Sequence, residues 1–391
     1  MNAPYLKTML SAFVLLPSFV SAGFFAPAAG TQYSTAVTAS DPSIIAWATG
    51  YQDYLPGAEA DAIFQTPQKA LGQPGNHDGN NAGSTFDIVS LGRGGSIVIT
   101  FDPPIVDGDD FDFAVFENSF SNTFLELAKV EVSSDGVNFV QFPAFSTVAS
   151  PVGSFGVSDA ADIEQLAGKY RAGYGTPFDL SQLAGNPLID LNNIGYIRLI
   201  DVVGDGSATN DISLEAAAHW AGITVAQLPQ YVVDGINAAP AAIYDPFPTI
   251  SSAGFDLDAI GVMNQRLIVE IDIAPADTTN TIDPDSTAVI PLAVLSSSIA
   301  EGDEVDFDAT QIDPTSLQFG YTAAANVAVP AASDVDGDGS TDMSFGFNTQ
   351  DTGIACEDTE AVLIGEMLSG EVFSATDFVS TGDCDDGGCH P

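Results

Sequence analysis

The chain has 391 residues, of which 53 are Asp or Glu and only 8 are Lys or Arg, so its formal net charge is −45 at pH 7. With so few cations there is no basic patch to neutralise phosphates, which excludes nucleic acid and anionic membrane surfaces as partners. Hydrophobic residues still make up 45% of the chain, which is enough for more than one domain core.

The N-terminal 22 residues have the pattern of a secretory signal peptide. Lys7 supplies the positive region, and MLSAFVLLPSFV (9–20) is an apolar stretch too short to span a membrane. The small residues ending at Ala22 form a cleavage site, so we expect 1–22 to be removed. No later stretch predicts a transmembrane helix, and the mature protein is expected to be secreted or to lie on a bacterial cell surface.

Residues 31–264 predict a β-sandwich or jelly roll. Short runs that alternate apolar and polar residues are separated by Gly, Asp, Asn and Pro. Segment 213–237 differs, because it is Ala-rich with helical spacing, and Ser213 and Thr224 are its expected helix N-caps. It predicts a helical insertion between the last two strands. The predicted strands are 96–101, 112–118, 128–136, 138–142, 196–203 and 255–262.

The β pattern resumes at 266–384 and predicts a second, smaller sandwich, followed by a tail at 385–391. Arg266 is the last basic residue, and 25 acids follow it without a single Lys or Arg. Such a domain must keep its carboxylates solvated or neutralise some of them with metal. The overall prediction is an all-β fold of two sandwiches. The strands expected in the second are 266–275, 287–297, 316–321, 342–349 and 361–367.

Two resemblances to known families follow from the strand segments. LGRGGSIVITFDPPI together with VEVSSDGVNFVQF is similar to galactose-binding-like jelly rolls, which include discoidin-type and many carbohydrate-binding modules. In chain order, KALGQPGN, FAVFEN, GYGTPFDL, IRLIDVVGDG and FDLDAIGV resemble a domain of secreted and cell-surface bacterial proteins. The segments EIDIAPADTTNTIDPDSTAVIPLAVLSS and DVDGDGSTDMSFGF resemble another secreted bacterial β-sandwich module with an acidic loop. These resemblances imply an extracellular binding protein.

The stretch DVDGDGSTD predicts a Ca²⁺ loop. Ca²⁺ takes six to eight oxygen ligands, and alternating Asp and Gly let a short loop wrap around the ion. Position 12 of the loop is Phe345 rather than the Glu of an EF-hand, and the next residues are strand-like. A structural Ca²⁺ loop is therefore favoured over a calcium switch, with a solvated acidic turn as the alternative. The expected ligands are Asp334, Asp336, Asp338, Ser340 and Asp342.

A second Ca²⁺ site is expected in the first sandwich. FDLDAIGV resembles the last strand of jelly rolls that hold a structural Ca²⁺, and the two Asp residues of this strand share a side by period-2 alternation. DGDDFDF (107–113) and Asp205 are further possible partners. Ordinary Asp-rich turns are the alternative. The expected ligands are Asp256, Asp258, Glu117 and Asp201.

Three smaller features complete the candidates. The polar loop around His77 and Asp78 could line a ligand face, although a mobile surface loop explains it equally well. Cys356 and Cys384 could form a disulfide worth about 2–4 kcal/mol, which would leave Cys389 as a spare thiol.

No catalytic motif stands out. HExxH, GxSxG, a Walker loop and a dinucleotide fingerprint are all missing from the sequence, and with 53 acids no single carboxylate pair is informative. The sequence favours a calcium-stabilised binding or adhesion protein that recognises a glycan or surface polymer. An extracellular polysaccharide-degrading enzyme and a purely structural matrix component are the alternatives.

Overall fold

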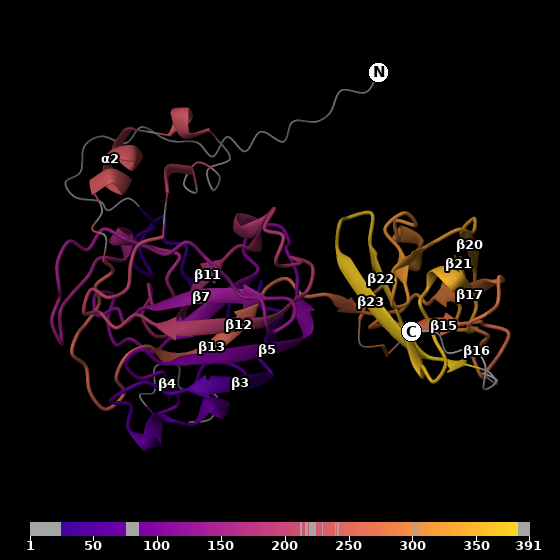
Figure 1. Ribbon diagram of the computed structural model, residues 1–391, viewed down its shortest axis with the longest axis horizontal. Coiled ribbons are helices and arrows are strands. Elements are labelled where there is room, and N and C mark those ends of the chain that lie inside the picture. The colour runs from indigo at the N-terminus through magenta and orange to yellow at the C-terminus, as the bar shows by residue number, and fades with distance from the viewer. Residues whose placement is uncertain are drawn as a thin grey trace.

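The computed structural model describes residues 25–75, 86–211, 213–215, 218, 224–228, 230–238, 240, 242–300, 302–303 and 305–381. These residues form an all-β structure, which confirms the predicted fold class. Two β-sandwiches lie side by side along the long axis of the molecule (Figure 1). None of the described helices is long and apolar enough to cross a membrane. The predicted signal peptide and tail lie outside the described residues.

The first sandwich consists of two antiparallel sheets. One has the strand order β1-β11-β6-β13-β2, with β4 also paired to β13, and the other has the order β3-β5-β12-β7-β8. β9 (Phe145–Ser146) and β10 (Ile163–Glu164) form a separate two-stranded pair. The bounds in the first sheet are β1 (Val37–Thr38), β2 (Ala46–Trp47), β4 (Val89–Ser90), β6 (Phe113–Glu117), β11 (Tyr174–Phe178) and β13 (Asp256–Val262), and in the second β3 (Gly50–Leu55), β5 (Ser96–Ile105), β7 (Ala128–Ser133), β8 (Val140–Gln141) and β12 (Ile194–Asp201).

The core of the first sandwich lies between these sheets. Alternate residues of the predicted strands point inward, as the period-2 pattern requires. Three rings, of Phe113, Phe142 and Phe178, have centroids 5.1–5.9 Å apart and are fully buried. Each such side chain stabilises the fold by about 2–3 kcal/mol on burial. All six strands predicted for this domain are present.

A bulge in β13 changes the direction of its side chains. The pairing of β13 with β6 shifts between Leu257, opposite Glu117, and Ala259, opposite Phe116. One extra residue reverses the alternation, so Leu257 and Ile260 both face the main core while Ala259 packs in a smaller cluster on the outer side. All seven residues of β13 are buried, including its two Asp residues.

The second sandwich encloses its own core. Its sheets have the orders β14-β23-β22-β18-β19 and β15-β17-β21-β20, and β16 pairs with β24. The predicted strands are present, with 266–275 divided into β14 and β15. The bounds are β14 (Leu267–Ile268), β15 (Ile271–Ile273), β16 (Thr281–Ile282), β17 (Val289–Val294), β18 (Gln318–Phe319), β19 (Ala324–Ala325), β20 (Ala331–Ser333), β21 (Asp342–Asn348), β22 (Glu360–Glu366), β23 (Val372–Phe378) and β24 (Ser380–Thr381).

The predicted helical insertion lies between β12 and β13. Within its described part, α2 (Gln230–Ala238) projects away from the sheets (Figure 1). Thr224 is an N-cap as predicted, since Gln227 and Thr224 form a capping box at the start of a short 3-10 helix. The described 3-10 helices are η1 (Ala62–Phe64), η2 (Pro67–Ala70), η4 (Ala160–Asp162), η5 (Leu180–Leu183), η6 (Val225–Gln227), η7 (Ala309–Gln311) and η8 (Thr349–Asp351).

Candidate functional site: a buried acidic cluster beneath an aromatic pocket

Five carboxyl groups gather inside the first sandwich, and we call them the buried acidic cluster. They come from the ends of β6 and β12, the start of β13, and the segments that precede β7 and β13. The electrostatic influence of the other four on Glu126 shows that they lie near one another. Each is at most 6% exposed. The members are Glu117, Glu126, Asp201, Asp245 and Asp256.

Asp201 is held by backbone amides. Its Oδ1 accepts a hydrogen bond from the amide of Phe255 at 2.8 Å, and its Oδ2 accepts one from Gly94 at 2.8 Å. Gly254 makes this approach possible, because its φ is +72° and a Cβ there would lie 2.4 Å from the carboxylate. Asp201 therefore ties β12 to the start of β13.

The other four members each keep one buried oxygen without a hydrogen-bond partner among the described residues. Glu117 Oε2 accepts from the amide of Ser119 at 2.7 Å, and Asp245 Oδ2 accepts from Leu127 at 3.0 Å. A buried oxygen that no donor satisfies costs about 1–3 kcal/mol. The oxygens concerned are Glu117 Oε1, Glu126 Oε1, Asp245 Oδ1 and Asp256 Oδ1.

Burial raises the pKa of every member of the cluster. The pKa of Asp256 rises to about 8 and that of Asp201 to about 6, because desolvation penalises the charged form. The pKa values of Glu117, Glu126 and Asp245 rise well above normal for the same reason, and the neighbouring carboxylates raise them further. The site therefore attracts protons or another cation.

A pocket of about 440 Å³ opens onto this cluster. Glu126 and Asp256 line it, together with Ser252. Its mouth is apolar and includes Phe120 and Phe155, which are 72% and 83% exposed. The rest of the lining is Asn118, Ser119, Phe124, Ser154, Pro248, Thr249 and Ile250. Convergent polar groups below an apolar opening are typical of ligand sites.

The aromatic side chains at the mouth contact one another in a row. The rings of Phe120 and Phe124 stack with centroids 4.6 Å apart, and Phe155 lies 6.2 Å from Phe124. Ser119 Oγ donates to the carbonyl of Phe124, which fixes the turn that carries the first two rings. Two largely exposed Phe side chains in one patch indicate a surface that contacts something other than water.

The structure brings the four residues predicted for a second Ca²⁺ site near one another. Glu117, Asp201 and Asp256 belong to the buried acidic cluster. Asp258 lies close enough to raise the pKa of Glu117, while its carboxylate also accepts a hydrogen bond from the amide of Gly75 at 2.9 Å. Sequence reasoning did not find Glu126 and Asp245. Glu126 carries a usable signal, because it is a single acid within the apolar run FLELA.

The predicted Ca²⁺ loop is arranged around three exposed carboxylates. One oxygen from each of Asp334, Asp336 and Asp338 lies within 4.8 Å of the others, a group that could hold a metal ion. Gly337 and Gly339 have φ values of +86° and +101°, as a tight wrap requires.

Two further residues of the predicted loop have different surroundings. Asp342 is buried at the start of β21, and its carboxylate accepts from the amides of Val335 at 2.7 Å and Ser296 at 2.9 Å. The amide of Ser340 donates to Asp338 at 2.6 Å. Asp342 therefore anchors the loop from behind, and its charge helps to raise the pKa of Asp336.

The loop lies at the junction of the two sandwiches. Asp336 and Asp338 line a cavity of about 710 Å³ whose other walls include Ile45 and Pro103 from the first sandwich. Arg266, in the connection between the sandwiches, lines the same cavity. A cation in this loop would therefore sit where the two sandwiches meet.

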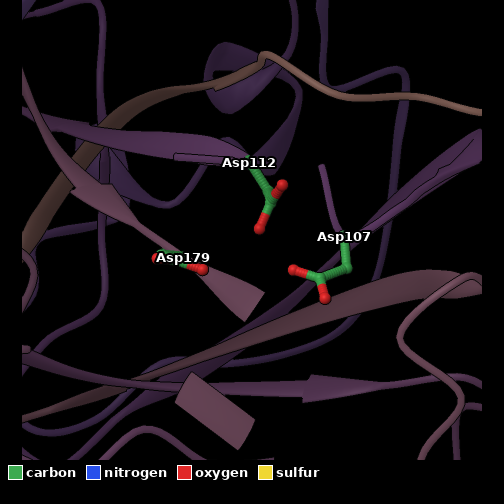
Figure 2. A group of neighbouring side chains, drawn as sticks. All are labelled: Asp107, Asp112 and Asp179. Atoms are coloured by element: carbon green, nitrogen blue, oxygen red, sulfur yellow. The ribbon is translucent and has the colours of Figure 1, made fainter. Parts of the chain in front are cut away.

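A second group that could hold a metal lies at the end of the first sandwich opposite the buried acidic cluster, next to Asn264. Asp107, Asp112 and Asp179 place carboxylate oxygens within 4.8 Å of one another, around a common space (Figure 2). Asp112 accepts from the amides of Leu180 at 2.6 Å and Gly108 at 2.8 Å, and its pKa rises to about 7 through burial. The sequence motif 107–113 is thus separate from the buried acidic cluster.

The remaining sequence candidates fall largely outside the described residues. His77, Asp78, Cys384 and Cys389 all do so. Cys356 is described and takes part in a disulfide.

Comparison with known proteins gives no further guide. No protein-family model matches the chain, and no curated protein matches it either.

The buried acidic cluster predicts an inverted pH dependence of stability. Burial raises the pKa of Asp256 from the 3.8 of a free side chain to about 8 in the folded state, so the folded state binds more protons between these values. Stability is then lost as the pH rises from about 4 to 8. In EDTA, Asp256→Asn should flatten this dependence of stability on pH. At pH 8 its free energy of unfolding should exceed that of wild type by about 1–3 kcal/mol.

Urea unfolding from pH 5 to 8.5 measures this effect. Asp109→Asn, at an exposed position in the same sandwich, is the control and should follow wild type. Equal slopes for wild type and Asp256→Asn would contradict the prediction.

Proposed function

We propose that this chain is an exported, calcium-stabilised binding protein whose first sandwich recognises a glycan or a related surface polymer. One observation carries the proposal: a pocket with exposed aromatic rings at its mouth and buried carboxyl groups at its floor. The acidic composition, the expected signal peptide and the resemblance to secreted jelly rolls agree with this function.

The pocket has both kinds of group that sugars need. The C–H faces of a sugar ring pack on aromatic side chains, here Phe120 and Phe155, and such rings contribute large contact areas. Sugar hydroxyls donate hydrogen bonds, and Glu126 and Asp256 each offer an oxygen that lacks a described donor. A hydroxyl-rich ligand would satisfy these oxygens, which an apolar ligand cannot do.

Calcium is the proposed occupant of the loop formed by Asp334, Asp336 and Asp338. Hard carboxylate oxygens on a flexible loop favour Ca²⁺, which accepts irregular coordination, over Mg²⁺, which requires near-octahedral geometry. The ion would lessen the mutual repulsion of the three carboxylates. Because the loop borders the cavity between the sandwiches, calcium would also stiffen their junction.

Hydrolysis is a second candidate, since two carboxyl groups line one pocket. A glycosidase needs one protonated and one ionised carboxyl group at the bond to be cleaved. Burial raises the pKa of both Glu126 and Asp256, which supplies the acid but disfavours the ionised partner. The geometry therefore favours binding over turnover. If the wild-type protein released reducing ends from a polysaccharide and Glu126→Gln did not, hydrolysis would be favoured over binding.

The calcium proposal predicts a loss of stabilisation on loop mutation. Saturating Ca²⁺ should raise the melting temperature, and a ligand at 100 times its Kd adds about 2.7 kcal/mol. Asp336→Asn keeps an acceptor for the amide of Asp338 but removes one charge, so the Ca²⁺-dependent shift should fall by at least half. Differential scanning calorimetry with Ca²⁺ or EDTA measures this shift. Glu371→Ala, at an exposed position in the same sandwich, should respond like wild type, and an unchanged shift in Asp336→Asn would contradict the loop site.

The glycan proposal predicts that binding depends on the aromatic mouth. A glycan array with and without EDTA identifies a ligand, and Phe155→Ala should weaken its binding about tenfold or more, as the loss of a stacking ring does. Phe378 is 52% exposed on the second sandwich, so Phe378→Ala is a matched control and should bind like wild type. An array with no bound glycan would refute the proposed function, and equal binding by both variants would move the site away from the pocket.

A further inference from the structure

The floor of the pocket lacks the positive charge that its carboxyl groups require. Glu126 and Asp256 are 5% and 4% exposed. The groups that act most strongly on their pKa values are other carboxyl groups and neutral serine hydroxyls. Glu117 and Asp245 lie behind them with a further unpartnered oxygen each. Isolated carboxylates in such surroundings are costly unless a cation approaches them.

The described basic side chains are engaged elsewhere. The four described ion pairs join Arg93 to Glu59, Lys129 to Asp211, Lys169 to Glu164, and Arg198 to Glu131. Three more cations donate to backbone carbonyls, namely Lys69 to Phe86, Arg171 to Ala172, and Arg266 to Asn192. The charge of Arg93 lowers the pKa of Asp201, which partly offsets the effect of burial. A cation that pairs with these carboxyl groups would therefore come from outside the described chain.

The geometry favours an organic cation over a bare metal ion. Among the described residues, the groups with three carboxylate oxygens within 4.8 Å of one another are Asp107–Asp112–Asp179 and Asp334–Asp336–Asp338. Glu117, Glu126 and Asp256 do not form such a group, so a metal would find no ready set of three ligands.

The mouth of the pocket supports the same choice. The faces of Phe120, Phe124 and Phe155 are electron-rich and attract ammonium groups. A metal ion would lose its hydration in passing them, whereas the apolar body of an organic ligand would pack against them.

We propose that the pocket binds its ligand through a free protonated amine held between Glu126 and Asp256, so that the recognised glycan is an amino sugar with an unacetylated amine. This inference rests on the proposed function, because it specifies the chemical class of the glycan. The ammonium group has three hydrogen bonds to donate, and Glu126 and Asp256 each have one unpartnered oxygen to accept one. The sugar ring would then pack against the aromatic mouth.

Two oligosaccharides of equal length and linkage test the inference. Isothermal titration compares the β-1,4-linked tetramer of glucosamine with its fully N-acetylated counterpart at pH 7. The free amine should give at least tenfold tighter binding, because charge-assisted hydrogen bonds are the stronger ones. Glu126→Gln and Asp256→Asn should each remove most of this preference. Asp109→Asn keeps the pocket intact and should retain it.

The outcomes separate this inference from the proposed function. If both tetramers bind equally, or the acetylated one binds more tightly, recognition through a free amine is wrong while the proposed glycan recognition stands. If neither binds, the amine is also wrong, and the array decides on glycans in general. Titration of Asp336→Asn with CaCl₂ alone tests the metal alternative. Binding heat that is lost when Glu126→Gln is added to Asp336→Asn would overturn the inference in favour of a metal site. A cooperative melting transition at or above the wild-type temperature confirms that the pocket variants fold.

Discussion

The burial of five carboxyl groups without a described cation is the constraint on which the first sandwich depends. A carboxylate removed from water must be protonated, hydrogen-bonded or paired. The fold meets part of this demand with backbone amides: Phe255 and Gly94 donate to Asp201, Leu127 to Asp245, and Ser119 to Glu117. These bonds tie the ends of β6 and β12 to the connections that precede β5, β7 and β13. The rest of the demand, one oxygen on each of four residues, is left for protons or a ligand.

The same residue type serves a different purpose in the second sandwich. Asp334, Asp336 and Asp338 are exposed, so water solvates their charge and the loop can form before any ion arrives. Asp342 is fully buried, and two amides occupy both of its oxygens. Each of the three exposed aspartates also accepts one amide, but from within the loop. Burial and the occupation of both oxygens, rather than the spacing of the acids, therefore make Asp342 a scaffold residue and leave three candidate ligands.

Much of the fold was predictable because strand alternation is a local property. The missed strands show the limit of that signal. β11 contains Pro177, which lies opposite Ala114 and which normally argues against a sheet interior. β23 has Ser374, Thr376 and Asp377 among its residues and lacks a clear apolar run. These two segments form strands because they pair with neighbouring strands, although their own sequences do not predict it.

Only the members of the buried acidic cluster that lie on strands could be predicted from the sequence. Glu117, Asp201 and Asp256 belong to strands whose existence the sequence reveals, so their proximity could be anticipated. Glu126 and Asp245 lie in connections, and long-range packing alone brings them to the same place. Gly204 is part of that packing, since a Cβ there would lie 2.0 Å from Asp245 Oδ1. A single sequence gives no pairing information for such contacts.

The position of the pocket links ligand binding to the stability of the sandwich. Glu126 lies directly before Leu127, whose amide donates to Asp245, and Asp256 begins the central strand β13. A cation that reaches these carboxyl groups relieves a cost borne by the folded state alone, because the unfolded chain solvates them. Any such ligand stabilises the fold by the free energy with which it binds. Because no described cation pairs with these carboxyl groups, their burial destabilises the first sandwich, and a cationic ligand would recover that energy on binding.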